Sequence, residues 1–413
     1  MKLTLTLSLA TLLLLSSCSK SNKSGTTTPP TNPTPPVTMK INLTTSIPNE
    51  EIIFSDSGGK VLLDTMTPYP SPLIASLVTA QTLIDLTTII YDTPEARYEV
   101  SSYKAVNPST WVALDPGIYS GPNFPQLSSA NATVVYTNTP AIPNGQFLID
   151  DYVSGYNLTN GTPAAGYLNV TYASYNPGNY VYLLLPYSGL YNFHLPPQGK
   201  ADTVDLSRMD TAVDLTYTKP AGYSLGSSLV YGIMDTTDID RTLMLYNTFG
   251  GSGLPDVEYP KKQVQKMEMF ISILDNSSTH YDQYYSYDDT IYPAPYWPSE
   301  TDYTISSNQP SAFSVAFTGV HPADYVTHWI TGNVFFAVDA PSDSTSLNPQ
   351  NMLSALKAAK LLQGQNLSGL TLNGFFFDIP GGLDYAGYNS FLHNPALWKT
   401  QHLASLMSHG VLY

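Results

Sequence analysis

The sequence predicts a mainly β protein: tandem antiparallel β-sandwich domains with two C-terminal helices packed on the second. Composition is the first reason, because charged residues make up only 12% while there are 31 Tyr and 33 Pro. Tyr and Thr favour strands, and Pro and Asn favour turns. The second reason is that short apolar–polar alternations recur about every 8–15 residues with no helical period between them. Helical spacing of apolar residues occurs only near the C-terminus.

The chain begins with the features of a secretory signal. Lys2 supplies a positive charge, Leu3 to Leu15 is almost wholly apolar or small, and two serines then precede Cys18. This order of charge, apolar run and small residues is typical of a cleaved signal peptide, here residues 1–17. The apolar run has about 13 residues, whereas a membrane-spanning helix needs about 20.

Leu15-Ser16-Ser17-Cys18 resembles the lipobox of bacterial lipoproteins. The resemblance implies a diacylglyceryl group on the Cys18 sulfur, cleavage before Cys18 and a further acyl chain, such as palmitate, on the new amino group. Several acyl chains would give lasting attachment to a lipid bilayer. Ser19, where lipoproteins kept at the inner membrane have Asp, implies the outer membrane of a Gram-negative cell. The periplasmic or cell-surface side stays open, as does an ordinary cleaved signal with a chance cysteine.

Residues 18–37 form a predicted tether that follows the anchor. The segment is rich in Pro, Thr and Ser and has almost no large apolar residue, so it cannot build a core and should be disordered and extended. Cys18 is the only cysteine of the chain. Once it is acylated, no intramolecular disulfide can form, and the fold depends on apolar burial and hydrogen bonds.

An N-terminal β-sandwich is predicted for residues 38–125. Met39 to Leu43 alternates apolar and polar residues, and two apolar runs flank Gly58-Gly59 as in a hairpin. Further strands are predicted at Leu83–Tyr91, Arg97–Tyr103 and Thr110–Leu114. By this pattern the segment resembles the prealbumin-like or immunoglobulin-like modules of bacterial surface lipoproteins.

Residues 126–413 form a predicted larger β-rich domain with a second series of strands. His280 to Tyr303, which holds seven Tyr and Trp297, is predicted to be a long ordered loop. Asn348 to Leu362 has an amphipathic helical pattern with Ser346 or Asn348 as its cap. Asn394-Pro395 predicts the start of a second helix, ending at Gly410, with Leu397, Leu403, Leu406 and Met407 on its apolar face.

The charge of the chain excludes one class of partner. The formal net charge is −15, with only 17 Lys and Arg. Nucleic-acid binding needs cations that contact phosphates. We therefore expect no nucleic-acid partner.

Motifs for catalysis are absent from the sequence. No Gly-x-Ser-x-Gly and no His-Glu-x-x-His occurs, and Ser354-Ala-Leu-Lys357 lacks the companion motifs of penicillin-binding enzymes. We therefore expect a non-catalytic protein. A secreted hydrolase stays as an alternative, because paired carboxylates cannot be located from sequence alone.

A calcium site is one candidate for ion binding. Asp235, Asp238 and Asp240 cluster in a predicted turn, and hard carboxylate oxygens suit Ca²⁺. The alternative is that these are solvated turn residues, since their spacing does not match an EF-hand loop.

Aromatic residues of the predicted loop suggest binding of a glycan or another surface protein. Tyr and Trp offer large flat faces and a polar tip that can stay in water. The candidate residues are Tyr284, Tyr285, Tyr287, Tyr292, Tyr296 and Trp297. One alternative is that they pack beneath the loop; another is that the chain is an adhesin or a subunit of a surface fibre.

Overall fold

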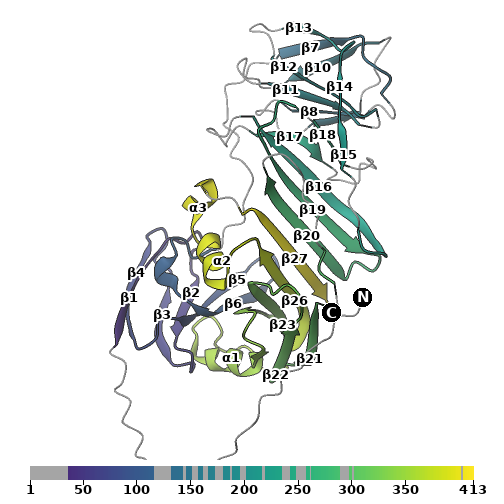
Figure 1. Cartoon of the computed structure of the whole chain (residues 1–413). Coiled ribbons are helices and arrows are strands. Elements are labelled where there is room, and N and C mark those ends of the chain that lie inside the picture. Colours follow the sequence, from purple (N-terminus) through teal and green to yellow (C-terminus); the bar gives the residue numbers. More distant parts are fainter. Residues whose placement is uncertain are drawn as a thin grey trace, which may run out of the picture. The chain divides into compact units, whose positions relative to one another are not determined.

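The computed structural model describes residues 36–115, 132–142, 146–150, 157–160, 166–172, 180–186, 188–195, 201–215, 219–234, 242–247, 257–260, 262–288, 297–299, 302–400 and 403–413 (Figure 1). The predicted signal peptide, Cys18 and most of the tether lie outside these residues.

The prediction of a mainly β fold is confirmed. Strands hold 56% of the structure and helices 8%, with the few helices short and two of them near the C-terminus. Within the described ranges no helix combines the length and the apolar character needed to cross a membrane.

One large sheet of twelve strands runs through the molecule. Its order is β17-β16-β19-β20-β27-β26-β23-β24-β6-β5-β2-β3. The bounds, in that order, are Thr242–Asn247, Tyr223–Ile233, Lys266–Asp275, His280–Asp288, Ser405–Leu412, Thr371–Pro380, Asp324–Thr331, Val334–Pro341, Arg97–Val106, Ile84–Asp92, Glu51–Ser55 and Val61–Met66. β24 and β6 run parallel, and all other neighbours are antiparallel. The sheet therefore joins strands from both ends of the sequence.

The N-terminal end of this sheet packs against a small second sheet, as a sandwich does. The second sheet pairs β1 (Val37–Leu43) with β4 (Leu73–Thr79). Apolar residues of β1, β2, β4 and β5 alternate inward and share a buried core that includes Ile41, Phe54 and Trp111. The predicted hairpin is confirmed as β2 and β3. The strand predicted at 110–114 is wrong, because a short 3-10 helix, Pro108–Thr110, and a single bridge from Ala113 to Thr44 replace it.

The middle of the chain forms smaller sheets. A three-stranded sheet contains Leu168–Tyr172 (β10), Ala132–Thr137 (β7) and Ala201–Asp205 (β13); a five-stranded sheet contains Asp210–Thr211 (β14), Leu190–His194 (β12), Val181–Leu185 (β11), Gln146–Asp150 (β8) and Asn157–Asn160 (β9). Val213–Leu215 (β15) pairs with Val257–Tyr259 (β18). β11 is buried along its whole length, because its side chains enter two cores, one on each face of its sheet.

The largest core lies against the middle strands of the large sheet, from β27 to β2. Tyr303–Gln309 (β21), Ala312–Phe317 (β22) and Ser346–Leu347 (β25) form a sheet that covers it. Helix α1, Pro349–Ala355, is capped by Asn348, whose side chain accepts a hydrogen bond from the Asn351 N–H. A 3-10 turn, Leu356–Ala358, follows, so the predicted helix exists but is shorter than the pattern indicated. Its residues Leu353 and Leu356 enter the same core as Trp329 and Phe375.

The end of the chain corrects one prediction. Asn394-Pro395 does start a helix, α3, Pro395–Thr400, after α2, Tyr385–Leu392. The predicted helix to Gly410 is wrong beyond that point, because Ser405–Leu412 forms β27. β27 is hydrogen-bonded to β20 on one side and to β26 on the other. Two complete ladders of backbone bonds favour the strand over a helix with a weak apolar face.

A single acidic side chain ties the two ends of the sequence together. Glu51 on β2 is fully buried, and its two carboxyl oxygens accept hydrogen bonds from the backbone N–H groups of Lys360 and Leu361, at 2.7 and 2.8 Å. The partners are 309 and 310 residues away in sequence. The segment after α1 is thereby held on the N-terminal strands.

Replacing Glu51 should therefore destabilise the fold. We expect Glu51→Ala to lower the free energy of unfolding by about 3 kcal/mol, because two backbone donors lose their partner in a buried place. Urea unfolding followed by circular dichroism measures the change. Glu95→Ala is the control, since the Glu95 side chain is 55% exposed. Equal stability of the two variants would contradict the role of Glu51.

Candidate functional site

The tyrosines of the predicted loop lie mainly on a strand. The loop prediction is wrong for 280–288, which form β20 with both edges paired. Side chains alternate along a strand, so Tyr284 turns into the core, 3% exposed, while Tyr285 is half-buried on the opposite face. The edge of Trp297 packs on the Tyr284 ring, with ring centres 6.4 Å apart.

Of the remaining candidates only Tyr287 is among the described residues, and it shares a face with Tyr285 but not with Tyr284. The Tyr287 ring lies on the same side of β20 as Tyr285 and is covered by the Lys266 ammonium, 5.0 Å from the ring centre. Tyr292 and Tyr296 lie outside the described residues. The structure therefore divides the described tyrosines of the cluster between a core and a sheet face.

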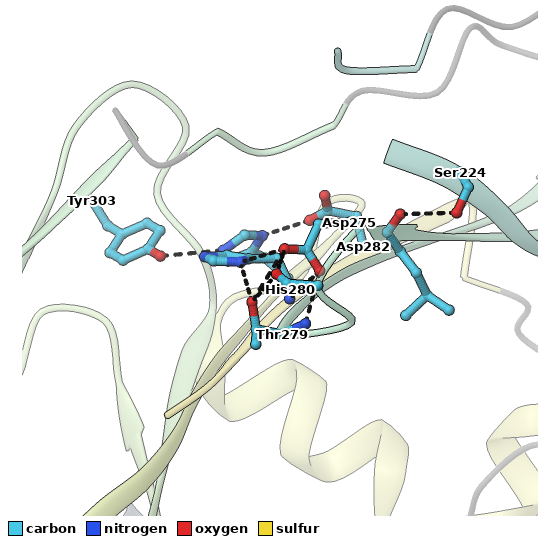
Figure 2. Close-up of polar contacts among 9 residues, drawn as sticks. Ser224, Asp275, Thr279, His280, Asp282 and Tyr303 are labelled. Carbon is cyan, nitrogen blue, oxygen red and sulfur yellow. Dashed lines mark hydrogen bonds and ion pairs between the residues drawn. The ribbon is translucent and has the colours of Figure 1, made fainter. Parts of the chain in front are cut away.

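Three buried polar side chains form a hydrogen-bonded chain across β20, β27 and β21 (Figure 2). Asp282 Oδ1 lies 2.5 Å from His409 Nδ1, and His409 Nε2 lies 3.3 Å from the Tyr303 hydroxyl. Their exposures are 0%, 1% and 9%. A catalytic triad needs a Ser or Cys nucleophile at the second imidazole nitrogen and access for substrate. Here a phenol occupies that place within the core, so the chain of bonds serves to connect three strands.

Asp275 organises the neighbouring hairpin turn, also seen in Figure 2. Its carboxylate accepts hydrogen bonds from the backbone N–H groups of Thr279 and His280, at 2.8 and 3.1 Å, and from the Ser277 hydroxyl. These bonds, that of Ser277 first, hold the pKa of Asp275 below its ordinary value. The carboxylate thus fixes the turn between β19 and β20.

A row of rings crosses one face of the large sheet. The Arg97 guanidinium lies 4.9 Å from the centre of the Phe335 ring. Ring centres are then 4.8 Å apart from Phe335 to His328, 4.4 Å from His328 to Phe376, and 5.8 Å from Phe376 to Tyr281. We call these five residues, all half-buried, the aromatic row. They come from β6, β24, β23, β26 and β20. Since β27 lies between β26 and β20, the row depends on the register of six adjacent strands.

Two glycines beneath the row leave room for the rings of Tyr281 and Phe376 close to the backbone. A Cβ at Gly410 on β27 would lie 2.4 Å from Cε1 and Cζ of Tyr281 and 2.7 Å from Cδ1 of Phe376. A Cβ at Gly374 would lie 2.7 Å from Cε2 of Phe376. The rings therefore occupy the space of the missing side chains, as aromatic residues do over strand glycines.

The charge of the row is confined to one end. Burial, and after it the positive charge of Arg97, lowers the pKa of His328 to about 4, so its imidazole is neutral at pH 7. Arg97 makes ion pairs with Glu95 and Glu99, at 2.6 and 2.7 Å. The middle of the row thus offers neutral rings, and its β6 end offers a guanidinium and carboxylates that can form hydrogen bonds.

Three carboxyl groups lie further along the same face, beneath α2. Asp324 and Asp378 are direct cross-strand partners, and Asp339 pairs with Val326, two residues along β23 from Asp324. The Tyr388 hydroxyl of α2 donates to Asp378 Oδ2 at 2.9 Å. Burial first, and then the neighbouring carboxyls, raises the pKa of Asp324; burial and Asp378 raise the pKa of Asp339 to about 8. Close carboxyls that share a dry place retain protons.

No metal site is evident in the described part of the chain, where no group of three His, Cys, Asp or Glu could hold an ion. The candidate calcium ligands Asp235, Asp238 and Asp240 lie outside that part.

A cavity of about 220 Å³ lies beside α1 and contains an ion pair. The Asp85 carboxylate is engaged by the Lys104 ammonium and by the Ala105 N–H, at 3.0 Å for the latter. Both oxygens of the Asp85 carboxylate therefore have partners. Hydrolysis of glycosides needs two carboxyl groups, and Asp85 is the one acidic residue among the described residues that line this cavity.

Comparison with known proteins adds no relative. No protein-family model matches the chain, and no curated protein is significantly similar to it.

Sequence reasoning missed the aromatic row. Among the three consecutive phenylalanines of β26, Phe375 and Phe377 are buried while Phe376 is half-buried. The contact of Phe376 with His328 comes from the register of β23 with β26, which pairs Val326 with Phe376 and His328 with Gly374. The alternation of Phe335 with buried Val334 and Phe336 is the one local signal that could have placed a phenylalanine on the outer face.

Asp339 should make the stability of the fold depend on pH. The unfolded carboxyl, with its ordinary pKa of 3.8, loses its proton well below pH 7, whereas the folded one keeps it to about pH 8. The unfolded state then binds fewer protons, so the free energy of unfolding falls as pH rises between these values, by up to about 1.4 kcal/mol per pH unit. We expect Asp339→Asn to flatten the fall between pH 7 and 8.

In that window folded His328 and His393 are neutral, because their pKa values are both lowered to about 4. Unfolded, with the ordinary pKa of 6.5, they add a slope of opposite sign that fades by pH 8. Glu50, whose pKa is raised to about 8 by burial and then by Asp115, leaves a residual slope. Urea unfolding at several pH values measures the effect. Asp343→Asn, at an exposed turn residue, is the control, and an unchanged slope in Asp339→Asn would contradict the assignment.

Proposed function

We propose that this chain is a non-catalytic, lipid-anchored protein of the cell envelope that binds extracellular glycans through the aromatic row. The anchor at Cys18 and the outer-membrane location rest on the Leu15–Cys18 motif of the sequence alone. The observation that supports glycan binding is the row itself, four half-buried rings and a guanidinium spread over one sheet face.

The chemistry of the row suits a sugar chain. Sugar rings have apolar C–H faces that pack on aromatic faces and hydroxyls that need polar neighbours. Phe376 and Tyr281 lie over glycines and are half-buried, and Gln283 lies beside Tyr281 on the same face of β20, also half-buried. Rings drawn from adjacent strands, which lie about 4.8 Å apart in a sheet, form an extended surface suited to an elongated ligand rather than a pocket.

Binding to polysaccharides tests the proposal. The full chain with Cys18→Ser, which cannot be acylated, is passed over insoluble cellulose, chitin, xylan and mannan and run in gels containing soluble polysaccharides. We expect at least one to bind, and Phe335→Ala and Tyr281→Ala each to weaken binding by at least about fivefold, a loss of roughly 1 kcal/mol.

The matched control is Tyr91→Ala, which removes a 48% exposed tyrosine of β5 that is outside the row. Circular dichroism establishes that each variant is folded. Absence of binding to every polysaccharide, or equal binding by the row variants and the control, would refute the glycan proposal and leave a protein partner as the ligand.

A second function, assembly into a surface fibre, is favoured by β4. Ile74 and Val78 on this strand are 76% and 65% exposed, and no strand in the described ranges pairs with the edge of β4 that faces away from β1. The strand carries no charged residue. Uncharged, apolar edge strands are sites of pairing with further chains.

Light scattering of the same Cys18→Ser chain tests this second function. Self-association should increase with concentration, and Ser76→Lys, which adds a charge between Ile74 and Val78, should abolish it. Ser71→Lys, an exposed position just before β4, should leave it unchanged. A monomer at all concentrations would exclude the fibre function.

A further inference from the structure

A cavity of about 350 Å³ opens where the end of β6 meets α2, away from the aromatic row. Its volume is on the order of ten liquid waters, which gives room for one sugar ring or a molecule of similar size. The residues that matter for its chemistry are Leu83, Val106, Thr110, Trp111, Tyr385 and Asn389.

The aromatic walls of this cavity are held from behind. Trp111 stacks on His393 with ring centres 3.5 Å apart and planes 1° from parallel, and the edge of Tyr103 packs on Trp111 at 5.6 Å. The Tyr385 hydroxyl donates to the Asp339 carbonyl oxygen at 3.5 Å. Both wall rings are more than nine-tenths buried. Rings fixed in this way present a preformed apolar surface, and a ligand loses little free energy in ordering them.

Asn389 lines the cavity and carries an acceptor that no described residue uses. Its side chain is on α2, and the residue is only 1% exposed. The Nδ2 group donates to the Tyr385 carbonyl oxygen at 3.2 Å, which fixes the orientation of the amide. The Oδ1 atom is buried and has no hydrogen-bond partner among the described residues. Because a buried carbonyl oxygen normally accepts a hydrogen bond, this atom calls for a donor from a ligand.

The mouth of the cavity adds donors and acceptors without charge. The Thr110 hydroxyl donates to the Asn107 carbonyl oxygen at 2.9 Å, so its own lone pairs can accept a bond. Asn107 Oδ1 accepts from the Ser109 hydroxyl at 2.6 Å, which leaves its Nδ2 group to donate elsewhere. None of the residues that line the cavity is Asp, Glu, Lys, Arg or His. An ionic ligand would find no counter-charge there, and a neutral one meets no penalty.

We propose that this cavity is a binding site for a single neutral, hydroxylated ring, of the class of an unmodified or N-acetylated monosaccharide unit. Its C–H face packs between Trp111 and Tyr385, and one hydroxyl donates to Asn389 Oδ1. The site is separate from the aromatic row and does not depend on the function proposed for it.

Saturation-transfer NMR and titration calorimetry of the full Cys18→Ser chain test the site. The probes are the methyl glycosides of glucose, galactose and mannose, together with N-acetylglucosamine. At least one should bind with a dissociation constant below about 10 mM. Ala386→Trp places a large ring at an exposed lining position and should weaken binding at least tenfold without disturbing the core.

Ala396→Trp is the matched control, an exposed alanine of α3 that does not line the cavity, and it should bind as the parent chain does. Tyr281→Ala should also bind the monosaccharide normally, which separates this site from the aromatic row. Failure of all four probes to bind, or unaltered binding by Ala386→Trp, would overturn the proposal and leave solvent as the partner of Asn389.

Discussion

The parallel pairing of β24 with β6 is the contact on which the rest of the structure depends. It matches Val334 to Tyr98 and runs for six residue pairs, and it makes one twelve-stranded sheet from strands near both ends of the sequence. The Glu51 carboxyl and the core shared by Ile53, Ile89 and Trp329 reinforce the same junction. A crossover from residue 106 to residue 334 costs chain entropy, and the apolar surface buried on the shared face offsets that cost.

The same junction decides what each face of the sheet can do. On one face the odd-numbered residues of β23 pack under α1, β21 and β22 in the largest core. On the other face α2 covers the sheet above Asp378, and the aromatic row lies beyond it, half-buried. Because side chains alternate in β-strands, the residues between those of this core point to the other face. The row and the acid cluster are both consequences of that division.

Local pattern was enough to predict most strands, and it failed where tertiary pairing overrode it. The loop prediction for 280–303 rests on its many Tyr, Pro and acidic residues, yet the two neighbours of β20 pair with every residue from 281 to 286. The helix prediction for the β27 segment rests on the apolar face of Leu403, Leu406 and Met407, yet β27 pairs with β20 and β26. The row could not be foreseen at all, because Arg97, Phe335 and Phe376 become neighbours only through a long-range register that no local period encodes.

Gly374 and Gly410 make room for two rings of the aromatic row. Glycine in a strand interior costs conformational entropy and offers no side chain to pack, so a face selected for stability alone would fill these positions with β-branched residues. Both glycines instead admit the rings of Phe376 and Tyr281, within 2.4–2.8 Å of where a Cβ would lie. Rings placed over these glycines recover part of the lost burial, and because they are only half-buried they also leave apolar surface on the outside. Apolar surface left on the outside is what a binding face requires, whereas a face that is only packed against other elements does not need it.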